Sequence, residues 1–265
     1  MPPRIRHIAI SSANSDLLLD FYASVFRMRR DEHGPVVFDG YVGLNVNRRG
    51  KGRQAGIDHF GFEVEDAQAI IARCKAAYPE INFLKRPDNR GFVGIGTHDP
   101  AGNVFDLSQA GMENRRGFYA SSSADWLPRH IDHFELRAVD PQRLAEFYQE
   151  VYALQLDRSA GDDGKLALTD GRVTLVIAPW SILDYAGTGI ERPAIEHLGF
   201  AVDSLDTFKR DLDRLMESRP ELFPAFNKES TEGARRMEIL AGCRRGEFRL
   251  NDPDGVLLDV SQAPS

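Results

Sequence analysis

The chain has 265 residues, with 33 Lys and Arg against 40 Asp and Glu, so its formal net charge is −7 at pH 7. This acidic balance argues against a nucleic-acid-binding protein that relies on a basic surface, and no apolar run is long enough for a membrane span. Met1 to Ile10 contain no long apolar stretch, so we expect no signal peptide. Cys74 and Cys243 have no partner motif, which predicts a reducing, cytoplasmic location.

A short apolar strand pattern with histidine at its third position recurs four times, and a helical pattern follows each copy. The strand copies begin at residues 5, 57, 131 and 195, and the helical patterns cover residues 14–28, 65–78, 140–154 and 203–217. Further strands are predicted within residues 36–47, 92–97, 165–178 and 246–250. The chain therefore holds four modules of one strand, one helix and more strands, which predicts an α+β fold.

A second repeat marks the end of each half. Residues 99–110 read DPAGNVFDLSQA and residues 252–263 read DPDGVLLDVSQA. In both copies an Asp-Pro-x-Gly turn leads into a short apolar strand. We therefore predict an N-terminal domain of residues 1–112, a connection of residues 113–128, and a C-terminal domain of residues 129–265.

The repeated histidines lie on predicted strands, where residues two apart share a face. We therefore expect His7 to share a face with Ile5, and His133 to share one with Ile131 and Glu135. Glu135 is a candidate site acid, with an ordinary strand carboxylate as the alternative.

Asp106 and Asp259 interrupt the otherwise apolar final strands of the two halves. A carboxylate in such a strand is costly to bury without a partner or a metal. Two imidazoles and one carboxylate with open positions suit Fe(II), with Mn, Co, Ni or Zn as competitors. The alternative is that the histidines are structural residues inherited by duplication. Combining each Asp with the two histidines of its own half predicts two metal-binding triads: His7, His59 and Asp106, and His133, His197 and Asp259.

The Ile-x-His strands, the Phe-Tyr helices at residues 21–22 and 147–148, and the Asp-Pro-x-Gly endings resemble the vicinal oxygen chelate superfamily. That superfamily includes glyoxalases, methylmalonyl-CoA epimerases, fosfomycin-resistance enzymes and extradiol ring-cleavage dioxygenases. The resemblance implies tandem βαβββ modules, two of which form an open cup around a metal. It places metal ligands on the first strands and the final strand, which picks out the same two triads.

Four modules in one chain resemble the two-domain extradiol dioxygenases, in which the C-terminal half usually carries iron. The chain departs from that pattern in two respects. In that family the last metal ligand is commonly Glu, whereas Asp106 and Asp259 occupy this position here. Arg249 occupies the position of a Tyr that the dioxygenases have. Arg249, with Arg244 and Arg245 near the same cup, is a candidate for binding a carboxylate or phosphate of the substrate, with a solvated surface charge as the alternative.

These patterns leave three functions open. The first is a metal-dependent enzyme, with Fe(II) as the favoured metal, that cleaves a small catechol-like ring. The second is a glyoxalase- or epimerase-like lyase or isomerase that works through a metal-bound enediolate. The third is a non-catalytic protein that binds a small molecule. In each case we expect a small-molecule partner, no nucleic-acid or membrane partner, and an open possibility of a homo-oligomer.

Overall fold

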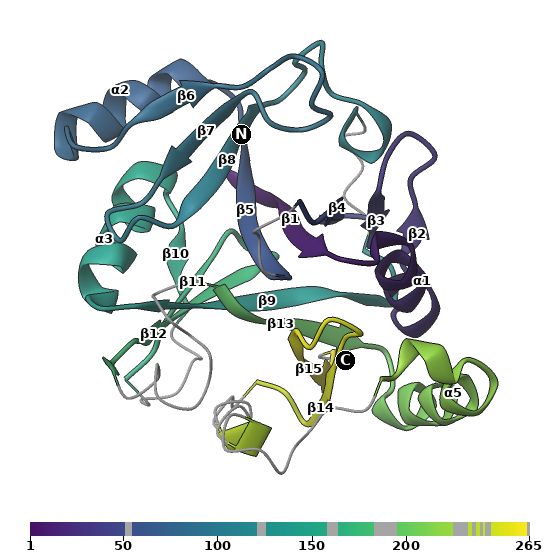
Figure 1. The fold of residues 1–265 in the computed structure, drawn as a ribbon. Coiled ribbons are helices and arrows are strands. Elements are labelled where there is room, and N and C mark those ends of the chain that lie inside the picture. The colour runs from purple at the N-terminus through teal and green to yellow at the C-terminus, as the bar shows by residue number, and fades with distance from the viewer. Residues whose placement is uncertain are drawn as a thin grey trace.

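Two mixed β-sheets, one from each half of the chain, form the framework of the molecule (Figure 1). A computed structural model describes residues 1–50, 55–120, 126–157, 164–182, 195–224, 233–234, 237–238, 241 and 245–263. The first sheet has the strand order β2-β3-β4-β1-β5-β8-β7-β6, and the second has the order β10-β11-β12-β9-β13-β15-β14.

The first half contains two complete βαβββ modules, as the repeats predict. The first module consists of β1 (Arg4–Ser12), α1 (Ser15–Val25), β2 (Arg29–Arg30), β3 (Val36–Phe38) and β4 (Gly43–Arg48). The second consists of β5 (Gly56–Val64), α2 (Ala67–Ala77), β6 (Phe83–Lys85), β7 (Ile95–His98) and β8 (Val104–Gln109). A short 3-10 helix, η1 (Gly117–Ala120), follows.

The second half repeats this order. Its first module consists of β9 (Arg129–Ala138), α3 (Pro141–Tyr152), β10 (Gln155–Leu156), β11 (Leu166–Thr169) and β12 (Thr174–Pro179). Its second contains β13 (Ile195–Val202), α5 (Leu205–Ser218), the 3-10 helix η2 (Pro220–Leu222), β14 (Phe248–Asn251) and β15 (Leu257–Gln262) among the described residues. The α+β fold of tandem modules is therefore confirmed.

Each long helix begins at a side-chain cap that the sequence supplies. The side-chain oxygens of Asn14, Asp66, Asp140 and Ser204 each accept a hydrogen bond from the backbone N–H three residues later. Such caps satisfy backbone donors that have no partner inside the helix. The apolar faces of these helices then pack on the sheets.

Strand pairing brings the first and last strands of the modules together. Within each half the two modules meet along their first strands, which pair antiparallel as β1 with β5 and β9 with β13. Each first strand also pairs in parallel with the last strand of its own module. Side chains on these neighbouring strands therefore converge at the centre of each sheet.

A β-bulge stands directly before each repeated histidine, and it corrects one expectation. The extra residue in the four first strands is Arg6, Asp58, Asp132 and Glu196, respectively. Because a bulge breaks the alternation of side chains, Ile131 joins the hydrophobic core while His133 faces away from it. Ile5 and His7 are separated in the same way, so the expected shared faces with these isoleucines are wrong.

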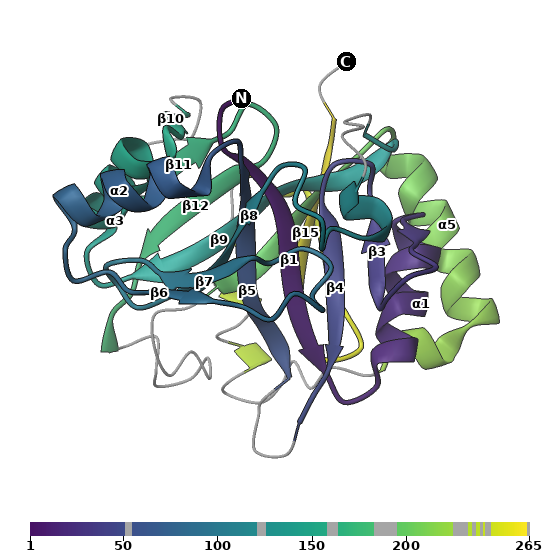
Figure 2. The ribbon, with the colours of Figure 1, turned by 90° about the horizontal axis from the view of Figure 1, so that it is seen from above.

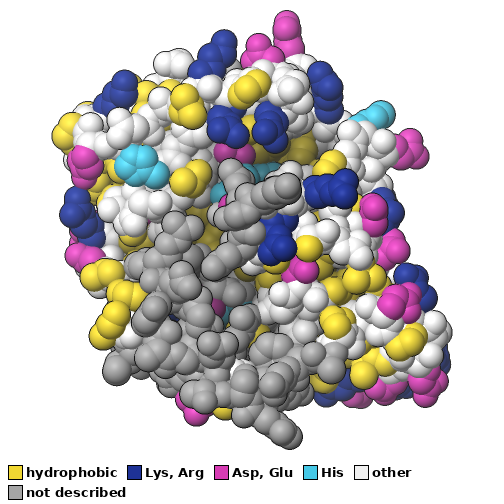
Figure 3. Space-filling model, in the orientation of Figure 1, with side chains coloured by type: hydrophobic (Ala, Val, Ile, Leu, Met, Phe, Trp, Pro, Cys, Tyr) yellow, Lys and Arg dark blue, Asp and Glu magenta, His cyan; other side chains and the backbone are white. Residues whose placement is uncertain are grey.

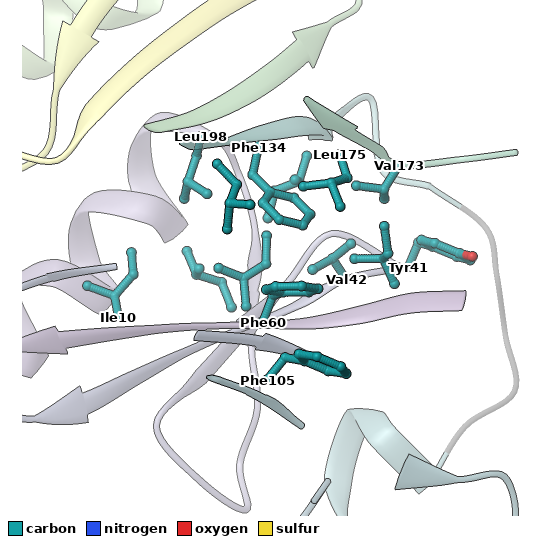
Figure 4. Packing of buried hydrophobic residues seen from close by; sticks show 14 of the residues in the cluster. Ile10, Tyr41, Val42, Phe60, Phe105, Phe134, Val173, Leu175 and Leu198 are labelled. Atoms are coloured by element: carbon teal, nitrogen blue, oxygen red, sulfur yellow. The ribbon is translucent and has the colours of Figure 1, made fainter. Parts of the chain in front are cut away.

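The main core lies between the two sheets. Figure 4 shows Phe60 from the first sheet facing Phe134 from the second. The ring centroids of Phe60 and Phe134 are 5.0 Å apart. The helices also pair across the two halves, α1 with α5 and α2 with α3 (Figure 2). The two cups consequently open away from this core, on the opposite face of each sheet.

Candidate metal centres

The C-terminal triad comes together at the centre of the second sheet. His133, His197 and Asp259 lie on β9, β13 and β15, and each is at most 1% exposed. Nε2 of His133 is 3.2 Å from Oδ1 of Asp259, and Nε2 of His197 is 4.0 Å from the same oxygen. One donor atom from each residue lies within 4.8 Å of the others. Two imidazoles thus face one carboxylate oxygen.

A glycine between the ligands explains how they approach so closely. Gly199 pairs with His133 on one side and with Asp259 on the other. A Cβ at Gly199 would overlap the His133 ring, and a Cβ at Gly246 would overlap the Asp259 side chain. Because glycine has no side chain, the two neighbouring ligands can lean over the strand.

Two acids lie on the Nδ1 side of the imidazoles, on the other side of each ring from Asp259. Nδ1 of His133 donates to Oδ2 of Asp132 at 2.9 Å, because a carboxylate can only accept. Nδ1 of His197 is 3.9 Å from Oε1 of Glu196. Burial alone would raise the pKa of both acids, but the histidines and neighbouring arginines outweigh it, so both pKa values lie below their ordinary values. A charged carboxylate therefore holds the His133 ring by a hydrogen bond, and a second one lies beside the His197 ring.

Glu135 lies in the same cup, close to His197. Oxygens of Glu135 and Glu196 and a nitrogen of His197 lie within 4.8 Å of one another. Nζ of Lys165 donates to Oε2 of Glu135 at 2.7 Å, and Arg137 pairs with Glu196. Each of these buried acids thus has a cationic partner, as burial of a charge requires.

Arg249 is also placed in this cup. It pairs directly with Asp259 in the register of β14 and β15, so the two side chains leave the sheet on the same face. Its guanidinium also donates to the carbonyl oxygen of Gly246 at 3.3 Å. Arg245 lies nearby, 3.8 Å from Asp132. Cys243 lies outside the described residues.

The N-terminal triad comes together in the first sheet with the same layout. Nε2 of His59 is 3.4 Å from Nε2 of His7 and 3.2 Å from Oδ2 of Asp106, and His7 is 4.0 Å from that oxygen. Gly61 pairs with both His7 and Asp106, as Gly199 does with its two neighbours. The two triads are therefore equivalent in strand position.

The surroundings of the two N-terminal imidazoles differ. Nδ1 of His59 donates to Oδ2 of Asp58 at 3.0 Å, whereas Nδ1 of His7 faces the hydroxyl of Tyr119 at 2.6 Å. Burial, together with the neighbouring His59, lowers the pKa of His7 to about 3. Burial also acts to lower the pKa of His59, but hydrogen bonds to Asp106 and Asp58 overcome it and raise that pKa to about 9. Asp106 and Asp58 thus favour the protonated, positively charged form of His59.

The donor chemistry of both triads fits a divalent cation. Each offers two imidazole nitrogens and one carboxylate, the mixed set that suits Fe(II) and the neighbouring transition metals. Three of the four imidazoles have an acid beside Nδ1, which leaves Nε2 directed at the triad. Such outer carboxylates are the usual partners of metal-ligating histidines. A cation would also neutralise the buried Asp259.

The outer acids were missed in reading the sequence, although it holds a signal for them. Asp58, Asp132 and Glu196 each directly precede a repeated histidine, so three of the four copies read Ile-acid-His. The fourth copy has Arg6 at this position. Its histidine takes Tyr119 as its Nδ1 partner instead, from far along the chain.

Comparison with known proteins identifies the family. Residues 130–260 match the model of the Glyoxalase/Bleomycin resistance protein/Dioxygenase superfamily. The C-terminal half of the chain, which this match covers, therefore belongs to the superfamily. A search of curated proteins finds no match. Within the described part of the chain, no helix is both long and apolar enough to cross a membrane.

Solved structures resemble the chain over nearly its full length. A catechol 2,3-dioxygenase shares 13% identity, with a TM-score of 0.60 and coverage of 98% of this chain and 92% of that one. The 2,3-dioxygenase LapB from Pseudomonas sp. KL28 shares 18% identity, with a TM-score of 0.61 and coverage of 99% and 92%. The Mn(II)-bound glyoxalase from Novosphingobium aromaticivorans shares 17% identity, with a TM-score of 0.57 and coverage of 98% and 81%. These similarities establish the fold.

Proposed function

We propose that His133, His197 and Asp259 hold a divalent metal, preferentially Fe(II), and that the protein is an extradiol-type dioxygenase acting on a small catechol-like substrate. The observation that carries this proposal is the buried set of two imidazoles directed at one carboxylate oxygen. Two imidazoles and one carboxylate are the donor set of many non-haem Fe(II) oxygenases. The similar dioxygenase structures support the choice of reaction.

The surrounding residues have distinct roles in this proposal. The bound metal supplies Lewis acidity for two adjacent substrate oxygens and, as Fe(II), redox chemistry with O₂. Asp132 and Glu196 keep the imidazoles oriented. Glu135, beside His197, takes and returns a substrate proton while Lys165 fixes its carboxylate. Arg249, on the same face as Asp259, binds an anionic substrate group.

Two observations favour the C-terminal cup over the N-terminal one as the catalytic site. The family match covers residues 130–260. In the N-terminal cup, the Phe92 ring stacks on the His7 ring with centroids 4.8 Å apart, and the Tyr119 ring lies edge-on to it at 5.6 Å, so side chains of this chain take up room beside the triad.

Oxygen consumption tests the proposal. Protein reconstituted anaerobically with Fe(II) is mixed with a panel of catechols, and we expect oxygen uptake with new absorbance from a ring-opened product. His133→Ala and Asp259→Ala should abolish uptake, whereas His33→Ala, an exposed histidine outside both triads, should retain it. Absence of uptake with every catechol at saturating iron would overturn the dioxygenase proposal.

A glyoxalase- or epimerase-like reaction at the same site is the second candidate. Glu135 beside His197 favours it, because this chemistry needs a carboxylate to move a proton next to a carbonyl. The similar Mn(II)-bound glyoxalase structure and the presence of Arg249 in place of a family Tyr also support it. Deuterium exchange next to a substrate carbonyl, without oxygen consumption, would favour this reaction. Metal content that is unchanged by His133→Ala would leave only a binding role.

A further inference from the structure

Side chains from this chain's own residues 92–119 occupy part of the cup of the first sheet. Three glycines of its wall each face such a side chain: Gly43 faces Tyr119, Gly61 faces Phe92, and Gly94 faces Met112. A Cβ at any of them would overlap that neighbour. In the second sheet, Gly199 and Gly246 make room only for ligand side chains of the triad, whereas Gly61 in the first sheet makes room for both Phe92 and Asp106.

Tyr119 fixes the orientation of His7. Its hydroxyl donates to the carbonyl oxygen of Gly43 at 3.1 Å, so at 2.6 Å it accepts from Nδ1–H of His7. The lone pair of the imidazole is then on Nε2, which faces His59 and Asp106. Tyr119 therefore orients the His7 ring through Nδ1, as Asp58 orients the His59 ring.

The segment that carries Tyr119 is anchored at several points. Arg115 forms an ion pair with the buried Glu63, and its Nε donates to the carbonyl oxygen of Tyr119 at 2.5 Å. The N–H of Phe118 donates to Oδ2 of Asp31 at 2.7 Å. The Phe118 ring also stacks on Phe38 at 4.5 Å. Buried groups thus hold this segment inside the cup.

We propose that His7, His59 and Asp106 form a second divalent-metal site, closed to substrate, whose role is to tie the segment around Tyr119 to the first sheet. The donor set equals that of the C-terminal triad, and every imidazole has a partner at Nδ1. The His59 side chain is 19% exposed, so an ion can reach the triad. Over the first sheet, Figure 3 shows a hollow in which histidine and hydrophobic side chains are visible beneath Lys and Arg side chains.

The site differs in function from the C-terminal one. Tyr119 lies behind the imidazole, on the Nδ1 side, so it is a positioning residue for His7 and does not touch the metal position. Phe92 and Tyr119, with centroids 4.8 Å apart, occupy the room beside the triad. His7, His59 and Asp106 would hold a metal there, and its role would be to link their strands. The consequence is a chain with two metals, only one of which meets substrate.

Metal stoichiometry of the full chain tests the second site. Protein dialysed against Co(II) should bind two ions per chain by elemental analysis, and His59→Ala and His197→Ala should each bind one. Asp106→Asn provides a second N-terminal variant, and circular dichroism checks that each variant is folded. One ion in both wild type and His59→Ala would overturn the second site. A loss of one ion in His59→Ala but none in His197→Ala would instead contradict the proposed C-terminal site.

Cobalt absorption tests whether the site is closed. In His197→Ala, the remaining Co(II) spectrum should not change when 4-nitrocatechol is added, whereas in His59→Ala it should shift. Tyr119→Phe should weaken N-terminal Co(II) binding about 10–100-fold, the range for loss of an outer partner. Tyr78→Phe, which removes a hydroxyl bonded to exposed Glu150, is the matched control. A nitrocatechol-induced shift in His197→Ala would overturn closure.

Discussion

Tyr148 in α3 donates a 2.9 Å hydrogen bond to Oδ2 of Asp99, which opens the turn before β8 in the other half of the chain. An equivalent contact links the halves the other way round: Tyr22 in α1 of the first half donates to Oδ2 of Asp252 in the second half at 2.9 Å. The Phe-Tyr helices and the Asp-Pro-x-Gly turns are thus repeated for a structural reason. Each half supplies one donor and one acceptor to the boundary between the sheets.

We predict that Tyr148→Phe destabilises the protein by about 1–3 kcal/mol, because a buried carboxylate oxygen loses one of its two hydrogen-bond donors and keeps the Asn103 amide. Tyr148 and Asp99 are both fully buried, so water cannot replace the hydroxyl. Urea unfolding measures the change. Tyr78→Phe removes an exposed hydrogen bond to Glu150 and should change stability by at most about 0.5 kcal/mol. Equal effects of the two variants would contradict a role for the buried contact.

The second prediction concerns the pH dependence of stability. Burial raises the pKa of Asp252 to about 7, despite hydrogen bonds from Val256 and Tyr22 that act to lower it. The ordinary pKa of Asp is about 3.9, so between about pH 4 and pH 7 the folded state binds more protons than the unfolded state. The free energy of unfolding therefore falls as pH rises through this window. Asp252→Asn, which cannot titrate, should lose less stability between pH 4 and pH 8 than wild type does.

A matched variant, Tyr22→Phe, should strengthen the pH dependence of stability that Asp252→Asn weakens. Tyr22→Phe leaves the Asp252 carboxyl buried but removes a hydrogen bond that lowers its pKa. Its stability should fall more steeply between pH 4 and pH 8 than that of wild type. Urea unfolding at several pH values compares the three proteins, and parallel curves would show that Asp252 does not titrate in this range.

The fold could be predicted because its signals are local and repeated. The Ile-x-His strands and the capped helices each contain their own pattern, and four copies in register define the modules. Each triad meets because the first strands pair with each other and with a last strand, a placement of ligands that the resemblance to the superfamily implies.

Other features depend on contacts between distant residues that no local pattern contains. Tyr119 reaches His7 across 112 positions of sequence, from a segment with little periodicity. The bulges before the histidines shift Ile5 and Ile131 to the core face, which the simple alternation of a strand cannot predict. The acids before His59, His133 and His197 are visible in the sequence, but their role depends on the bulge that turns them toward Nδ1.

The third prediction uses the close approach at Gly199. A Cβ there would overlap the His133 ring, so Gly199→Ala should displace the imidazole and remove one metal equivalent per chain. We also expect a loss of about 1–3 kcal/mol in the free energy of unfolding, the range for overpacking a filled site. Gly34→Ala is the control, because a Cβ at Gly34 would meet no atom within 4 Å. Full metal content in Gly199→Ala would contradict the proposed position of His133.

The last prediction addresses the acid behind the proposed catalytic metal. Asp132 accepts from Nδ1 of His133 at 2.9 Å and lies 3.8 Å from Arg245, so a charged carboxylate holds the ring and increases the basicity of Nε2. Asp132→Asn keeps an acceptor oxygen but loses the charge, whereas Asp132→Ala loses both. We expect about 10-fold weaker Co(II) binding at the C-terminal site for Asn and about 100-fold for Ala. Asp58→Ala, the equivalent change behind His59, should weaken only the N-terminal site, because each acid contacts the imidazole of its own half. Titrations in the His59→Ala and His197→Ala backgrounds separate the two sites, and an equal loss at both would mean that the acids act through the stability of the fold and not through their own histidines.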